Sequence, residues 1–290
     1  MSAHIRLVAS ERNLLIMKKV LLFILIAIAL PMAADAQRPP PPPKGMPTPA
    51  APELGASSYI LMDFHSGSVL VENTADMHVE PASITKVMTS YVVFNELAEG
   101  NITLADTVNV SEKAWRTGGS RMFIEPGMEV TIEELLRGMI IQSGNDASVA
   151  LAEHLAGTEE AFAGLMNHYV VQLGMTNSNF TNATGLPDEN HYTSARDVAL
   201  LSIALIRDFP DLYTWYSEKE YSFNNIRQHN RNNLLWRDPA VDGLKTGHTQ
   251  SAGYCLAASA KRDGMRLISV VLGSSSESSR VSESQSLLNY

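Results

Sequence analysis

The chain has 290 residues, a net charge of −9 at pH 7 and a single cysteine, Cys255. Its acidic and basic residues are scattered without a long run of one sign, which argues against nucleic acid as the main ligand. One thiol excludes an internal disulfide framework, and we expect Cys255 to be a small core residue. The eight histidines show neither HExxH nor a paired-ligand spacing, so we expect no metal and no other cofactor.

The first 36 residues have the pattern of a secretory signal peptide. A charged start is followed by an apolar middle at residues 20–30 and by a small-residue cleavage site that ends at Ala36. The apolar run is shorter than the roughly 20 residues that cross a bilayer, so we expect cleavage after Ala36, with an uncleaved anchor as the alternative. Met17 begins a complete signal by itself and is an alternative start. The sequence therefore predicts an exported protein.

Residues 37–53 are dense in proline, which predicts an extended and solvated linker. The following residues, 54–290, exceed the usual size of one small domain, but single α/β units reach this length. We therefore expect one domain after the linker.

The predicted elements begin with a hairpin made of strand-like runs at residues 57–62 and 68–71. From residue 81 to about residue 211 the pattern is helical. Thr131 and Asn145 are predicted to cap two of the helices. The segments with the clearest helical spacing are 132–141, 146–155 and 196–207.

Three strand-like runs follow near the end of the chain, at residues 241–247, 253–260 and 265–272. The last two flank Asp263-Gly264, a strong signal for a hairpin turn. Strands at both ends with helices between them predict an α/β (α+β) fold, in which distant segments form one antiparallel sheet and the helices form a second lobe. An active site would then lie in the cleft between sheet and lobe.

Residues 81–97 (PASITKVMTSYVVFNEL) have the pattern of an apolar helix that carries Ser83 and, one turn later, Lys86. Side chains three positions apart on a helix can converge. A serine hydroxyl needs a base to become a nucleophile, and a lysine kept neutral by burial is one such base. Alone, this pair also fits a capping serine beside a surface lysine.

Two further polar motifs follow on a predicted loop and a predicted strand. Ser143-Gly144-Asn145 closes the helix at residues 132–141, where a turn could direct both polar side chains into the cleft. Alone, it also fits an ordinary helix-capping turn. Lys245-Thr246-Gly247-His248 offers a cation and a hydroxyl to a carboxylate, and Gly247 has no side chain to block a ligand laid along the strand. Alone, it also fits a strand end with a solvated lysine.

Together the three motifs favour one interpretation. An SxxK pair, an S-D-N element and KTG are the signature set of penicillin-binding proteins and class A β-lactamases. Here SxxK, SGN in the place of S-D-N, and KTG occur in that order, and β-lactamases usually carry SDN. Longer segments also resemble the D-alanyl-D-alanine carboxypeptidases, the low-molecular-mass penicillin-binding proteins of the serine DD-peptidase family. These segments are PASITKVMTSYV, LRGMIIQSGNDA, FTNATGLPDENHYTSARD and VDGLKTGHTQSAGY, and the resemblance covers about residues 54–272. It implies a β-lactamase/DD-peptidase-like fold.

The resemblance implies a catalytic role for three residues. Ser83 would attack the D-Ala-D-Ala peptide bond, and neutral Lys86 would take its proton. Burial and the nearby Lys245 would lower the pKa of Lys86 towards the roughly 7–8 suited to a base. Ser143 would relay a proton to the leaving D-alanine. The backbone N–H groups of Ser83 and His248 resemble the family's oxyanion hole.

The resemblance also implies how the substrate is held. Asn145 would hold the substrate amide, and Lys245, Thr246 and His248 would bind the terminal carboxylate region, with Gly247 in the same motif. Arg231 is similar to a family arginine that attends the same carboxylate, with a surface salt bridge as the alternative. The implied partners are peptidoglycan stem peptides and β-lactam antibiotics, in the periplasm or at the outer face of the inner membrane of a bacterium.

Three other functions are alternatives to this one. A β-lactamase of the same fold needs a glutamate in a loop before the KTG motif, and the context of Asp188 and Glu189 (PDENHYT) does not fit. A catalytically silent peptidoglycan-binding or penicillin-sensing module would carry a damaged motif, whereas all three are intact. Endopeptidases that cleave cross-links share the same residues and remain an alternative.

Members of this family commonly continue into a C-terminal β-rich domain and an amphipathic membrane-anchoring helix. The sequence ends at Tyr290, within what the pattern predicts to be the last helix of the catalytic domain. We therefore expect the anchor to be absent or the chain to be a fragment, and membrane association stays an open alternative.

Overall fold

The structure is a computed structural model that describes residues 49–290. The predicted signal peptide, residues 1–36, lies outside the described residues, as does the predicted linker up to residue 48. Among residues 49–290, no helix combines the length and hydrophobicity that would be needed to cross a membrane.

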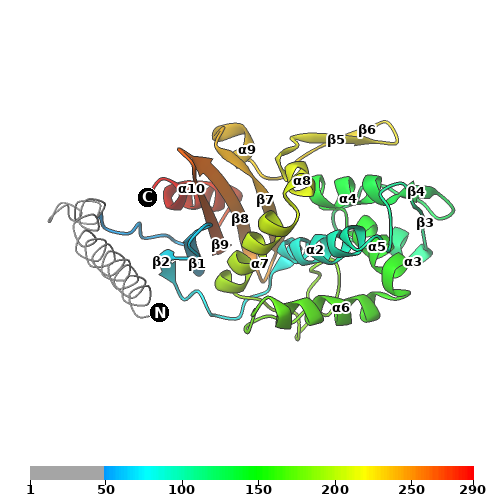
Figure 1. The fold of residues 1–290 in the computed structure, drawn as a ribbon, viewed down its shortest axis with the longest axis horizontal. Coiled ribbons are helices and arrows are strands. Elements are labelled where there is room, and N and C mark those ends of the chain that lie inside the picture. The colour runs from blue at the N-terminus through cyan, green and yellow to red at the C-terminus, as the bar shows by residue number, and fades with distance from the viewer. Residues whose placement is uncertain (1–48) are drawn as a thin grey trace, which may run out of the picture. The chain divides into compact units, whose positions relative to one another are not determined.

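A five-stranded sheet lies on one side of the described domain, next to the helical lobe (Figure 1). Its order is β2-β1-β9-β8-β7, and every neighbouring pair is antiparallel. The first and last parts of the chain meet in it, because β1 pairs directly with β9. The predicted antiparallel sheet built from distant segments is confirmed. Its strands are β1 (Ser58–Asp63), β2 (Val69–Asn73), β7 (Val241–Thr249), β8 (Gly253–Arg262) and β9 (Met265–Ser274).

The predicted turn between β8 and β9 is present. Asp263 and Gly264 both have positive φ, at 49° and 83°, as the two central residues of a type I′ turn require. Arg262 and Met265 pair across this turn, and the register continues to Lys261 opposite Arg266. Local turn chemistry therefore sets the register of the longest hairpin in the sheet.

Both faces of the sheet are apolar. In β1, Tyr59 and Leu61 belong to the hydrophobic cluster that includes residues of α10 (Glu277–Leu288). The alternate residues Ile60 and Met62 belong to the larger cluster shared with the helical lobe. Because strand side chains alternate between faces, the sheet is sandwiched between α10 and the lobe.

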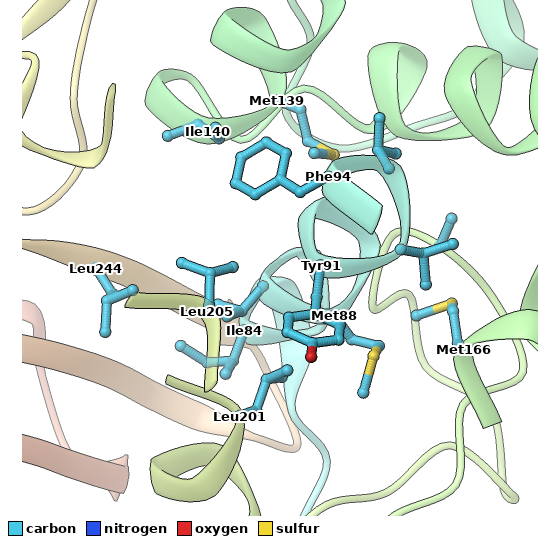
Figure 2. Close-up of a cluster of buried hydrophobic side chains, with 14 of the residues drawn as sticks. Ile84, Met88, Tyr91, Phe94, Met139, Ile140, Met166, Leu201, Leu205 and Leu244 are labelled. Carbon is cyan, nitrogen blue, oxygen red and sulfur yellow. The ribbon is translucent and has the colours of Figure 1, made fainter. Parts of the chain in front are cut away.

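The lobe is built around α2 (Thr85–Ala98), whose first ten residues are all buried. A helix that is buried on every side lies in a core rather than at a surface. Figure 2 shows Met88, Tyr91 and Phe94 of α2 among side chains from other helices and from β7. The other α-helices are α3 (Glu112–Arg116), α4 (Ile132–Ile141), α5 (Asn145–Ala156), α6 (Glu159–Gln172), α7 (Ala195–Asp208), α8 (Pro210–Tyr213) and α9 (Leu234–Arg237).

The expected helices are largely confirmed, with one capping error. Thr131 caps α4 in a full capping box with Glu134. The cap of α5, however, is Gly144, and Asn145 is the first helical residue, so the predicted cap at Asn145 is wrong. Cys255 is buried, as predicted.

Short elements lie within the segment predicted to be helical and directly after it. The 3₁₀ turn η1 (Ala82–Ile84) precedes α2, so the predicted helix does not begin at residue 81. Two small hairpins were also not predicted. They are β3 (Thr107–Asn109) with β4 (Glu129–Thr131), and β5 (Glu220–Phe223) with β6 (Ile226–His229), while a second 3₁₀ turn is η2 (Thr214–Ser217).

Candidate active site

Ser83 and Lys86 are brought together at the junction of η1 and α2. The Lys86 ammonium nitrogen, Nζ, lies 3.0 Å from Ser83 Oγ. Ala82 has a φ of 47°, which is rare for a residue with a side chain and turns the chain sharply just before Ser83. The pair predicted from the SxxK spacing therefore forms a direct hydrogen bond.

Lys86 is only 1% exposed, and its Nζ has three oxygen neighbours. These are Ser83 Oγ, Asn145 Oδ1 at 2.6 Å and the Thr184 carbonyl oxygen at 2.6 Å. A neutral amine has two N–H donors and one lone pair. With its donors directed to Asn145 and Thr184, the lone pair can accept the proton of Ser83 Oγ.

The electrostatics of the site favour that neutral amine. The pKa of Lys86 is lowered to about 7, mainly by burial, with Asp146 acting to raise it and Arg231 to lower it. We expected Lys245 to lower the pKa of Lys86, but the neighbouring cation that does so is Arg231. The repulsion between the two lysines instead lowers the pKa of Lys245. At neutral pH a large fraction of Lys86 is therefore free to act as a base.

Asn145 belongs to this arrangement through its side chain. Its Oδ1 accepts from Lys86, and its Nδ2 donates to the Gly118 carbonyl at 2.7 Å. Gly119 has a φ of 88°, and a Cβ there would lie 2.6 Å from Asn145 Nδ2. A residue without a side chain is therefore needed where this loop backs Asn145.

Ser143 lies at the end of α4 in an unusual backbone conformation, with a φ of 68°. Its side chain is 2% exposed, and its Oγ has no hydrogen-bond partner among residues 49–290. A buried hydroxyl without a partner is uncommon and costs about 1–3 kcal/mol. Its hydroxyl is therefore available to a group that enters the site.

Strand β7 forms the opposite wall and carries Lys245, Thr246 and Gly247. A Cβ at Gly247 would lie 2.9 Å from the Pro81 carbonyl oxygen, which shows that β7 packs directly against the segment leading into Ser83. We expected Gly247 to leave space for a ligand along the strand. The structure shows another reason for a glycine at this position, because the chain before η1 occupies the space that a side chain would need.

A cavity of about 330 Å³ opens between the two walls. Six predicted residues line it, while Lys86, Asn145 and Lys245 lie buried behind that lining. Four lining residues, Ser120, Tyr254, Glu277 and Arg280, were not predicted from the sequence. The full lining is Ser83, Ser120, Ser143, Arg231, Thr246, Gly247, His248, Tyr254, Glu277 and Arg280.

Arg280 is the most informative of the missed residues. Its guanidinium donates to the Gly247 carbonyl at 3.2 Å and lies 3.5 Å from Glu277. Its Nε has no partner among the described residues, although the side chain is buried. The signal in the sequence was a lone arginine in a helix otherwise rich in serine and glutamate. Long-range packing was needed to place it here.

The cavity is therefore rich in cations, and most of the acceptors they contact are neutral backbone carbonyls. Lys245 is 2% exposed and donates to the Thr246 carbonyl at 3.3 Å, and Arg231 donates to the Gln142 carbonyl at 3.1 Å. Burial, followed by repulsion from Lys86, Arg231 and Arg280, holds the pKa of Lys245 well below its usual range. Such a site favours an anionic ligand, which would pair these charges. A base-activated hydroxyl beside an anion site suits acyl transfer to a serine.

Comparisons with known proteins agree with this geometry. A profile of the D-alanyl-D-alanine carboxypeptidase family, peptidase S11, matches residues 46–276. The D-alanyl-D-alanine carboxypeptidase DacA of Escherichia coli K12 is 49% identical over 249 residues, which are 83% of this chain and 62% of that protein. The chain thus spans less than two thirds of the length of this relative.

Solved structures support the predicted fold class. Penicillin binding protein 5 from Haemophilus influenzae superposes with a TM-score of 0.82 at 47% identity, over 83% of this chain and 72% of that chain. Penicillin-Binding Protein D2 from Listeria monocytogenes, in its ampicillin-bound form, gives a TM-score of 0.75 at 27% identity, over 81% and 97% of the two chains. The predicted DD-peptidase-like fold is confirmed.

Proposed function

The chain belongs to the D-alanyl-D-alanine carboxypeptidase family, and from this premise we propose that it is a serine peptidase that removes the terminal D-alanine from peptides ending in D-Ala-D-Ala. One observation carries the proposal. Ser83 Oγ lies 3.0 Å from a buried Lys86 whose pKa is about 7, at the edge of a cavity whose far side holds cations.

The first step is acylation of Ser83. Neutral Lys86 accepts the hydroxyl proton as Ser83 Oγ forms a bond to the carbonyl carbon of the D-Ala-D-Ala peptide bond. The negative charge that develops on the carbonyl oxygen is stabilised by the backbone N–H groups of Ser83 and His248, and such donors contribute about 3–4 kcal/mol each. The C–N bond then breaks. Ser143, whose hydroxyl is free, relays the proton from Lys86 to the leaving amine.

The cationic side of the cavity, formed by β7 together with Arg231 and Arg280, recognises the substrate. Lys245, Thr246, Arg231 and His248 receive the terminal carboxylate of the peptide, and Arg280 adds a fifth polar group. Asn145 holds the substrate amide while it also orients Lys86. A carboxylate placed here would give these cations a charged acceptor in addition to the backbone carbonyls, so we expect a preference for a free C-terminus.

The second step releases the shortened peptide. Water attacks the acyl–Ser83 ester, its proton passes to Lys86, and Ser83 Oγ recovers a proton as it leaves the carbonyl carbon. A penicillin presents a strained amide and a carboxylate in a similar arrangement, and so it would acylate Ser83 as well. The natural substrates would be peptidoglycan stem peptides, met after export to the periplasm or the outer face of the inner membrane.

Intact-protein mass spectrometry after addition of benzylpenicillin tests the proposal, together with release of D-alanine from a peptide ending in D-Ala-D-Ala. We expect a one-to-one adduct that maps to Ser83 and persists, and Ser83→Ala should abolish both the adduct and D-alanine release. An adduct that disappears within seconds would favour a β-lactamase. Folded protein that forms no adduct and releases no D-alanine would overturn the proposal in favour of a silent binding module.

A further inference from the structure

A loop behind Lys86, defined here as residues 180–191 and called the acceptor loop, supplies one of its three oxygen neighbours. The Thr184 carbonyl oxygen lies 2.6 Å from Lys86 Nζ. The next residue, Gly185, packs so closely that a Cβ there would lie 1.8 Å from the Ala82 carbonyl oxygen. The position of this loop relative to the start of α2 therefore decides where the Thr184 carbonyl points.

His191 joins the acceptor loop to the first turn of α2. Its ring is 2% exposed, and its Nε2 lies 2.8 Å from Thr85 Oγ1, on the residue next to Lys86. Its Nδ1 lies 3.0 Å from the Thr181 backbone nitrogen. One ring thus contacts both sides of the junction that contains Lys86.

The two contacts determine which ring nitrogen carries the proton. The Thr181 N–H can only donate, so Nδ1 of His191 is the unprotonated acceptor. In the neutral ring, Nε2 then carries the hydrogen and donates to Thr85 Oγ1. A neutral Nε2–H tautomer satisfies both contacts, whereas a doubly protonated ring loses the bond from Thr181.

We propose that His191 is a positioning residue for Lys86, because its ring fixes the acceptor loop against α2 and so holds the Thr184 carbonyl in contact with Lys86 Nζ. The inference rests on the proposed function in one respect, namely that Lys86 is the base. His191 does not line the cavity, so its effect is exerted through Thr85 and the acceptor loop.

The electrostatics at His191 fit this role. Burial lowers the pKa of His191 to about 4, Asp188 in the loop raises it, and Lys86 on α2 lowers it. The ring is therefore uncharged in the pH range where Lys86 would be a base. A charged ring would repel protonated Lys86 and lose its acceptor function, so neutrality is required.

Other contacts hold the acceptor loop, so loss of His191 should loosen it rather than unfold it. Thr89 Oγ1 donates to the Ala183 carbonyl at 2.7 Å, and the Ala183 N–H donates to Glu159 at 3.1 Å. A carbonyl near an ammonium stabilises the protonated form. A loosened Thr184 carbonyl should therefore lower the pKa of Lys86 and also leave its lone pair less well directed towards Ser83.

The test is the pH dependence of the second-order rate of acylation by benzylpenicillin, measured on the full chain. His191→Gln keeps a donor near the Nε2 position, and His191→Asn keeps an acceptor near the Nδ1 position. We expect both variants to acylate about tenfold more slowly, since small displacements at a reacting centre can cost up to about 10²-fold. We also expect the acid limb of the pH–rate profile, where the rate falls as Lys86 becomes protonated, to move to lower pH by a few tenths of a unit. The control, His168→Gln, changes an exposed histidine and should match the wild type.

A merely structural role would lower the melting temperature without moving the acid limb, and that result would overturn the inference. Thr85→Val removes the acceptor of the same bond, so the double variant with His191→Asn should be no slower than the slower single variant. Additive losses would contradict the coupling.

The ring itself gives a readout that needs no activity. Nitrogen-15 NMR of the wild type should show a histidine that keeps the neutral Nε2–H form down to about pH 5. Its absence would overturn the inference even if a variant failed to fold. A wild type that is not acylated, but shows this tautomer, would instead refute the proposed role of Lys86 as the base.

Discussion

The two walls of the cavity each contain a buried lysine, and the two lysines have different surroundings. Lys86 is 1% exposed and Lys245 is 2% exposed, so burial lowers the pKa of both. Lys86, however, has three oxygen neighbours at 2.6–3.0 Å. Lys245 donates to one, the Thr246 carbonyl at 3.3 Å, among the described residues.

This difference shows how one residue type can serve two tasks. The acceptors around Lys86 hold it in a single geometry and offset part of the free-energy cost of burying its charge. Its pKa is near 7, and its lone pair lies beside a hydroxyl. Around Lys245 the neighbouring charges are cations, and its one hydrogen bond is to a neutral backbone carbonyl. The first wall is organised by its own hydrogen bonds, whereas we expect an anionic ligand to complete the second.

Replacement of Lys86 should produce the largest effect. We expect Lys86→Met to fold, because methionine is an unbranched side chain of similar length, and to acylate about 10²–10⁴ times more slowly, the usual contribution of a general base. The measurement is the time course of the benzylpenicillin adduct by mass spectrometry. Wild-type kinetics in the variant would remove Lys86 as the base and make the two lysines equivalent.

Replacement of Lys245 should impair recognition more than chemistry. Loss of one partner from a buried charge pair costs about 2–5 kcal/mol, so Lys245→Met should lose at least about 30-fold in kcat/KM for a D-Ala-D-Ala peptide. The matched control is the same peptide with a C-terminal amide. The wild type should lose most of its advantage with the amide, while the variant should treat both peptides alike. A variant that still prefers the acid would contradict the assignment of Lys245 to the carboxylate.

The sequence predicted the parts of the site that depend on local spacing. Ser83 and Lys86 are one helical turn apart, and the turn at Asp263-Gly264 fixes the β8–β9 hairpin, so short patterns were sufficient. The hairpins in the middle of the chain are only three or four residues per strand, too short to give a clear period.

The rest depended on contacts between distant segments. A polar residue at a helix start usually caps it, but the side chain of Asn145 bonds to Lys86 and Gly118 instead, and these tertiary contacts override the local rule. The Thr184 acceptor is a backbone carbonyl and leaves no trace in residue type. Arg280 reaches the cavity from the last helix, far along the chain from every motif.

Arg280 of α10 tests the wall that contains Lys245, because its guanidinium donates to the Gly247 carbonyl of β7. We expect Arg280→Gln to lower kcat/KM for the D-Ala-D-Ala peptide by about tenfold, since a hydrogen bond to a charged group contributes about 1.5–3 kcal/mol. The adduct rate at saturating penicillin should change little. Arg237→Gln is the control, because Arg237 is an exposed arginine nearby that does not line the cavity. Equal effects of the two substitutions would exclude a specific role for Arg280.

The smallest effect concerns stability, and it tests whether burial lowers the pKa of Lys86. The folded pKa of about 7 lies below the usual value of 10.5, so between these values the unfolded chain binds a proton that the folded chain does not. The stability of the wild type should therefore rise with pH in this window, by up to about 1.4 kcal/mol per pH unit from this group. Lys86→Met lacks the group, while Lys245 is present in both proteins, so the effect of its burial on stability is common to both. Urea unfolding of both proteins at pH 7.5 and pH 9 should show the difference, wild type minus variant, rising by about 1–2 kcal/mol. A constant difference would mean that Lys86 is charged in the folded protein, and the distinction between the two walls would then rest on hydrogen bonding alone.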